Sequence, residues 1–190
     1  METKEKGIDL TGYHQIGEIR NLRGTMARIS NAMVLAIPII GILLYAFVLH
    51  RSYDGLQHPW YVQLLIIVLL YPFNCVLHEL LHGGVFKLFC PAGTVKFKWG
   101  LLGSVTSTAG SLYKWPFILM VLTPVLVLTI GYGCLAAFVP TCFAAFYVTA
   151  LFGLASGSND LLLAVPVIFR YRPGDVIADG DHTFLVYRKA

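Results

Sequence analysis

Residues 60–89 read WYVQLLIIVLLYPFNCVLHELLHGGVFKLF, with no Asp, Glu, Lys or Arg before Glu79. The hydrocarbon core of a bilayer is about 30 Å thick, so a helix that crosses it needs roughly 20 mostly apolar residues. This stretch meets that requirement and predicts a transmembrane helix. The two histidines and the glutamate of His-Glu-Leu-Leu-His at 78–82 fall in its C-terminal half, at a depth where ionisable groups are costly.

Three further stretches of the chain satisfy the same criterion, at 32–49, 115–139 and 142–169. Of the 190 residues, 57% are hydrophobic and 13% are charged, and the mean hydropathy is +0.71. A soluble domain of this length cannot bury so much apolar surface, and the low charge excludes intrinsic disorder. We therefore expect an all-α integral membrane protein with four transmembrane helices, organised as a single membrane-embedded domain over residues 1–190.

The basic residues are unevenly distributed between the segments that flank these helices. Of the 14 Lys and Arg, only Arg51 lies in a loop on the far side from the two termini. Because cytoplasmic segments are enriched in Lys and Arg, both termini and the loop at 90–114 are expected in the cytoplasm of a multi-pass protein of a bacterial plasma membrane. This orientation explains the basic residues, so they give no support for binding of nucleic acid.

Short β-structure is expected outside the helices. Residues 95–99 alternate in hydrophobicity as a strand does and are followed by a glycine turn, which predicts a hairpin between the second and third helices. Asp179-Gly180 is a hairpin turn signal and predicts a small β-rich cytoplasmic tail. Residues 16–29 carry apolar side chains at near-helical spacing, which fits either an interfacial helix on the inner leaflet or a solvated tail.

His78, Glu79 and His82 form an HExxH motif. Residues four apart in an α-helix lie one turn apart on the same face, so both imidazoles can reach one ion while the glutamate flanks it. This spacing suits zinc and a glutamate that acts as a base. Three ionisable groups at membrane depth favour a functional site over the alternative, a polar helix end that hydrogen-bonds at the interface.

Catalytic zinc sites generally have three protein ligands and a water molecule, so a third ligand is expected elsewhere in the chain. The other glutamates all lie in the N-terminal segment, and His50 and His58 belong to the opposite, outer loop. His14 and His182 lie in terminal segments. Asp160 is the only other carboxylate within a predicted helix. It is the expected third ligand, and the alternative is a hydrogen bond to a neighbouring helix.

The expected depths of these ligands agree. The midpoint of the motif and Asp160 each lie about nine residues before the cytoplasmic end of their helix, which is roughly 13 Å at the rise of an α-helix. Gly153 and Gly157 form a pair of small residues four apart that would let the fourth helix approach the second closely. Two separate features of the sequence therefore indicate one site.

The chain has HExxH near the cytoplasmic end of one predicted membrane helix and Asn-Asp on a later one, and in this arrangement it resembles the intramembrane zinc metallopeptidases of the site-2-protease type. More narrowly, it resembles a family of small four-helix membrane proteins described as putative zincin peptidases. The resemblance follows the chain in order, through HELLHG at 78–83, the polar hairpin segment, Pro124, and GSNDL at 157–161.

The resemblance implies that His78, His82 and Asp160 bind zinc and that Glu79 is the base. The sequence departs from the larger site-2 proteases in one respect. The larger site-2 proteases have a longer motif of the Asn-Pro-Asp-Gly type. Here the motif is reduced to Asn159-Asp160, and Leu161 follows in place of the glycine. The departure bears on the role of Asn159 more than on that of Asp160.

The expected function is hydrolysis of peptide bonds in membrane proteins or peptides, near the cytoplasmic face. Zinc would polarise a water molecule and the peptide carbonyl, and Glu79 would take the proton of the water and pass it to the leaving amine. Asn74, one turn before His78, and Asn159 are candidates for orienting a histidine or contacting the substrate. The hairpin at 95–108 either holds an extended substrate at its edge or only seals the cytoplasmic mouth.

A different class of function uses the same ligands without catalysis, in a membrane zinc sensor, chaperone or accessory protein. Such a protein does not need a carboxylate directly after the first histidine, whereas hydrolysis does, so Glu79 discriminates between the two classes. A haem-binding four-helix protein is disfavoured, because His78 and His82 share one helix face and cannot lie on opposite sides of a porphyrin.

Overall fold

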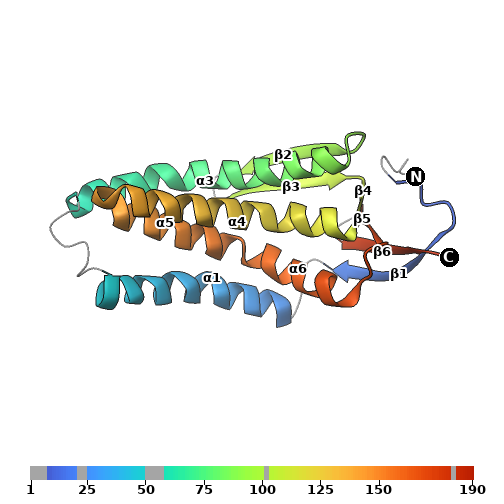
Figure 1. Ribbon diagram of the computed structural model, residues 1–190, viewed down its shortest axis with the longest axis horizontal. Helices are drawn as coiled ribbons and strands as arrows, with labels where there is room; N and C mark the ends of the chain where they lie inside the picture. The colour runs from blue at the N-terminus through green and yellow to red at the C-terminus, as the bar shows by residue number, and fades with distance from the viewer. Residues whose placement is uncertain (1–7, 21–24, 50–57, 101–102, 181–182) are drawn as a thin grey trace.

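The structure is a computed structural model that describes residues 8–20, 25–49, 58–100, 103–180 and 183–190. It is mostly helical, with the helices side by side along the long axis and a four-stranded sheet at one end (Figure 1). The helices are α1 Thr25–Leu44, continued by the π-helix Tyr45–Leu49; α3 Trp60–Phe89; α4 Lys114–Phe138; the 3-10 turn Pro140–Cys142; α5 Phe143–Ser156; and α6 Ser158–Arg170.

Within the described residues, three helices are long and apolar enough to cross a membrane: Ala27–Val48, Trp60–Phe89 and Lys114–Phe138. Their outer faces expose large apolar side chains such as Leu35 and Leu69, which suits contact with lipid. The predicted helix at 60–89 has the observed bounds, the one at 115–139 is shifted by one residue, and the first begins at Thr25 instead of residue 32.

The fourth predicted helix, expected to run unbroken over 142–169, is broken at Gly157. The two pieces are long and apolar enough to cross a membrane only when taken together. They are Pro140–Ser156 and Ser158–Arg170, and the angle between them is 48°. The hydroxyl of Ser156 donates to the carbonyl of Gly153 at 2.9 Å, and such bonding back to the preceding turn bends helices. The break places Asp160 in the first turn of α6, where the helix dipole favours a negative charge.

Helix α4 is central in the bundle, because it packs against α3, α5 and α6, while α1 packs against α5 and α6 (Figure 1). The two small residues singled out in the sequence serve two different contacts. A Cβ built on Gly153 would lie 3.6 Å from Oδ1 of Asn74 on α3, and one on Gly157 would lie 2.2 Å from Cγ2 of Val125 on α4. The break can therefore approach α4 only because residue 157 has no side chain.

The strands form two antiparallel sheets. The larger has the order β1-β6-β5-β4, with β1 Tyr13–Arg20, β4 Ser111–Tyr113, β5 Val176–Gly180 and β6 Thr183–Lys189. The smaller is the hairpin of β2 Thr94–Gly100 and β3 Gly103–Ala109. Both predicted hairpins are present, but their turns are displaced: Gly100 pairs with Gly103, and Asp179 and Gly180 pair with Phe184 and Thr183, so these predicted turn residues end the strands.

The interfacial helix and the solvated tail predicted for residues 16–29 are both wrong for the first part of this segment. Residues Tyr13–Arg20 are a strand that pairs along β6, close to the other end of the chain. Ile19, which the helical spacing assigned to a lipid-facing side, is 7% exposed within the core. The helix begins at Thr25, and residues 21–24 lie outside the described ranges. This segment is a strand because it pairs with β6, which is distant in the sequence, and the local spacing of apolar residues does not reveal that pairing.

Two buried charged residues join the sheet to the helix ends. The ammonium group of Lys114, at the start of α4, donates to the carbonyls of Ile168 and Tyr171 at 2.8 and 2.6 Å, at the end of α6. Asp175, 1% exposed, accepts two hydrogen bonds from Arg188 on β6, both 2.7 Å long. These bonds with Arg188 hold the pKa of the Asp175 carboxyl below its usual value. The junction fixes the position of α6 relative to α4 and the sheet.

Replacement of Gly157 by Ala is expected to destabilise the fold by about 1–3 kcal/mol, because the new methyl group overlaps Val125 on α4. Gly131→Ala on α4 is the matched control, since a Cβ there meets nothing within 4 Å. Thermal unfolding of the two variants in detergent micelles measures the difference. Equal melting temperatures for both variants would contradict the tight packing described at the break.

Candidate metal centre

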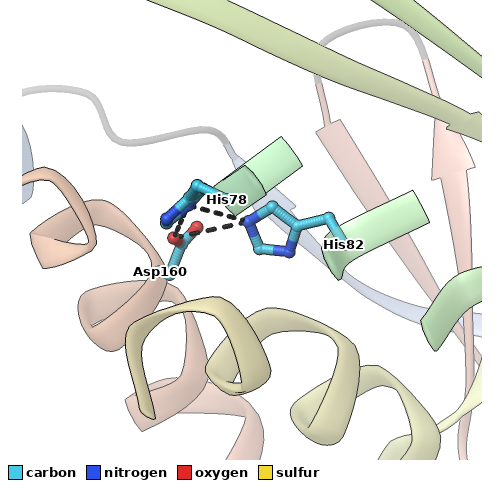
Figure 2. Close-up of side chains that lie close together, drawn as sticks. All are labelled: His78, His82 and Asp160. Carbon is cyan, nitrogen blue, oxygen red and sulfur yellow. Dashed lines mark hydrogen bonds and ion pairs between the residues drawn. The ribbon is translucent and has the colours of Figure 1, made fainter. Parts of the chain in front are cut away.

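His78 and His82 on α3 and Asp160 on α6 point towards one another (Figure 2). Nε2 of His78 lies 3.0 Å from Oδ2 of Asp160 and 3.2 Å from Nε2 of His82. The third separation, from Nε2 of His82 to the same carboxylate oxygen, is 3.5 Å. The three residues thus present one ligand atom each to a common point, as a metal ion requires.

The three separations fit tetrahedral zinc. Zinc bonds to histidine nitrogen and carboxylate oxygen are about 2.0–2.1 Å long, so two ligands of a tetrahedral ion lie about 3.3–3.4 Å apart. The observed range of 3.0–3.5 Å brackets this value. Two imidazoles and one carboxylate also match the donor set of catalytic zinc sites, which keep the fourth position for water. The residues present therefore fit a zinc ion.

The three side chains of the cluster are mostly buried. The side chains of His78, His82 and Asp160 are 10, 14 and 19% exposed, respectively. Burial in an apolar bundle strengthens the attraction between a metal ion and these ligands, since the surrounding dielectric is low.

A main-chain carbonyl orients His82. Its Nδ1–H donates to the carbonyl oxygen of Met120 on α4 at 2.9 Å. A carbonyl can only accept, so Nδ1 carries the proton and Nε2, which faces the cluster, has its lone pair available. Met120 could not be predicted from the sequence, because every residue has a backbone carbonyl group and only the fold brings this one to His82.

The structure separates the two asparagines that the sequence analysis singled out. Asn74 is 3% exposed and lies one turn before His78 on α3. Asn159 is directed elsewhere, since its Oδ1 accepts a hydrogen bond from the hydroxyl of Ser30, a buried residue of α1. This hydrogen bond ties α6 to α1.

Glu79 lies beside the cluster without belonging to it. It is half-buried on α3 between the two histidines, and the group of ligand atoms that converge does not include its carboxylate. Glu79 therefore follows the first histidine directly on α3 and is not one of the three converging ligands.

The hairpin of β2 and β3 covers α3 next to the motif. The hydroxyl of Thr106 on β3 donates to the backbone carbonyl of Glu79 at 3.1 Å. A Cβ built on Gly83 would lie 2.7 Å from Cζ of Phe97 and 3.1 Å from Cγ1 of Val95, both on β2. The hairpin therefore sits directly against the helix that carries both histidines, and Gly83 permits this close approach.

Fold and cluster together define a helical protein with apolar, span-length helices and, inside its bundle, a His-His-Asp cluster whose ligand atoms could hold a metal ion. Residues 71–175 match a protein family described as putative zincin peptidase, and the matched region contains the whole cluster, the hairpin and helices α4 to α6. The chain belongs to this family, and membership implies a metallopeptidase and zinc as its metal. No curated protein and no solved structure matches the chain.

Full-length protein purified in detergent is expected to hold about one zinc ion per chain, measured by mass spectrometry of metals. His78→Ala and Asp160→Ala should each lose that ion, because the remaining two ligands cannot complete a three-ligand site. His14→Ala and Asp9→Ala, at exposed positions, are the matched controls. Zinc retained by both site variants, with helical content unchanged, would exclude this cluster as the metal site.

Proposed function

We propose that this protein is an intramembrane zinc-dependent peptidase of the site-2-protease type, formed by a single domain over residues 1–190. Its substrates are membrane proteins or membrane-associated peptides, hydrolysed near the cytoplasmic face. The observation that carries the proposal is the convergence of His78 with Asp160, 82 residues later, beside a second histidine and a glutamate in HExxH order. Membership in the zincin peptidase family supports the same chemistry.

The roles of the residues follow from their positions. His78, His82 and Asp160 hold zinc, and Met120 keeps His82 in the tautomer that can ligate. A bound zinc ion would act as a Lewis acid and polarise water and the peptide carbonyl. Glu79 accepts a proton from the attacking water at a carboxylate oxygen and later donates it to the amine that leaves.

Membrane embedding in four spans is part of the proposal, with the bent pair of α5 and α6 as the fourth span. The exposed apolar faces of α1, α3 and α4 support contact with a lipid bilayer. The pairing of β1 with β6 at the same end as the start of α4 supports placement of both termini on one side. The excess of Lys and Arg in these segments favours the cytoplasm for that side, in a bacterial plasma membrane.

Substrate presentation is the task we infer for the hairpin of β2 and β3. A transmembrane helix hides its peptide bonds in its own hydrogen bonds, so a substrate must be extended before cleavage. A two-stranded hairpin has outer edges that can pair with an extended chain. The contact of Thr106 with the backbone of Glu79 supports this role, because it links the hairpin to the residue that acts as the base.

The decisive test of hydrolysis is Glu79→Gln. The variant should keep its zinc, since Glu79 is not a ligand, and lose about 100-fold or more in cleavage rate, which is the usual contribution of a general base. The probe is a set of synthetic peptides with one apolar helix and polar flanks, reconstituted in detergent and read by mass spectrometry. Glu18→Gln on β1 is the control.

Cleavage retained in Glu79→Gln would contradict the mechanism. Zinc-loaded wild-type protein that cleaves none of the peptides would favour the non-catalytic class, a membrane zinc sensor, chaperone or accessory protein.

Gly83 and Gly84 provide a matched pair for testing the hairpin. Gly83→Val should displace the hairpin from α3 and lower peptide cleavage while zinc is retained, because its side chain overlaps Phe97 and Val95. Gly84→Val is the control, since a Cβ there meets nothing within 4 Å. Peptide cleavage and zinc content are measured for both. Equal cleavage rates in the two variants would contradict a role for the hairpin in substrate presentation.

A further inference from the structure

Two buried polar atoms on neighbouring turns of α3 have no hydrogen-bond partner among the described residues. They are Nδ1 of His78 and Oδ1 of Asn74. The two residues are 8 and 3% exposed. Buried polar groups are nearly always hydrogen-bonded in folded proteins, so two such atoms close together in sequence call for a physical explanation.

The two atoms are chemically complementary. Nε2 of His78 faces Asp160 and His82, so a metal ion on that nitrogen requires the proton of the neutral imidazole to be on Nδ1. Nδ1–H is then a donor without an acceptor, and the amide oxygen of Asn74 is an acceptor without a donor. Residues four apart on a helix are neighbours on one face, where side-chain hydrogen bonds form.

We propose that Asn74 is a positioning residue for the metal centre, which accepts a hydrogen bond from Nδ1–H of His78 when zinc is bound. Its amide does for His78 what the carbonyl of Met120 does for His82, since each fixes one tautomer and directs Nε2 to the metal. This inference deepens the proposed function and rests on it, because it requires a metal ion at the cluster.

The packing around Asn74 supports this assignment. A Cβ built on Gly153 of α5 would lie 3.6 Å from Oδ1 and 3.8 Å from Nδ2 of Asn74, so the glycine leaves room for the amide against the helix behind it. Ser158, in the first turn of α6, is the competing acceptor, because it is fully buried and its hydroxyl has no partner among the described residues. Asn74 is favoured because it shares a helix and one face with His78.

The test compares zinc affinity of the full chain in detergent, measured by competition with a chromophoric chelator. Asn74→Leu should bind zinc about 10–100-fold more weakly, the usual effect of losing the outer partner of a metal-ligating histidine. Asn74→Asp keeps an acceptor oxygen and should stay near wild type. The absorption spectrum of the Co²⁺-substituted protein should change in Asn74→Leu and not in Asn74→Asp, which a role in packing alone does not predict.

Gln63→Leu is the matched control, a second buried amide on α3 far from the cluster. Gln63 bonds to the carbonyl of Thr141 at 2.8 Å and to the N–H of Ala145 at 3.0 Å. The control variant should therefore lose thermal stability and keep its zinc affinity. Asn74→Leu should show the reverse, because the acceptor oxygen that it removes has no hydrogen-bond partner among the described residues.

Wild-type zinc affinity in Asn74→Leu, or a loss in Ser158→Ala that Asn74→Leu does not share, would overturn the role of Asn74 and leave the proposed function intact. Wild-type protein that binds no zinc would overturn both.

Discussion

The cost of placing ionisable side chains inside an apolar helix bundle is the constraint on which the rest of the structure depends. A histidine pair and a carboxylate at this depth are tolerated only when they are paired with one another or with a metal ion. His78, His82 and Asp160 meet this condition at 3.0–3.5 Å. The surrounding features place them there: the break at Gly157 starts a new helix just before Asp160, and the carbonyl of Met120 directs His82.

Two kinds of feature could be predicted from the sequence because their causes are local. The bounds of α3 follow from hydropathy alone, because an apolar run of this length fits neither a soluble domain nor a disordered segment. The two hairpins follow from strand-like segments interrupted by glycine, although Gly100 and Gly180 end the strands and do not form the turns. Asp160 was singled out by elimination, in a chain with few carboxylates in its helices, and the structure brings it beside the two histidines.

The remaining features depend on partners distant in the chain, which local patterns do not reveal. Strand β1 exists because β6 pairs with it, so the helical spacing of Ile16 and Ile19 was misleading. The bend at Gly157 depends on Val125 of α4, although the run of Ser and Gly at 156–158 is a weak signal for it. Asn159 faces α1 because Ser30 binds it there, and the sequence offered no means of choosing between that contact and the cluster.

The central claim is that zinc is held between α3 and α6 by two imidazoles and one carboxylate. X-ray absorption spectroscopy of the zinc-loaded full chain tests it most directly. The account predicts a first shell of nitrogen and oxygen atoms only, four in number at about 2.0–2.1 Å, with the outer-shell scattering of two imidazole rings. A sulfur ligand at about 2.3 Å, or a shell without imidazole scattering, would contradict it.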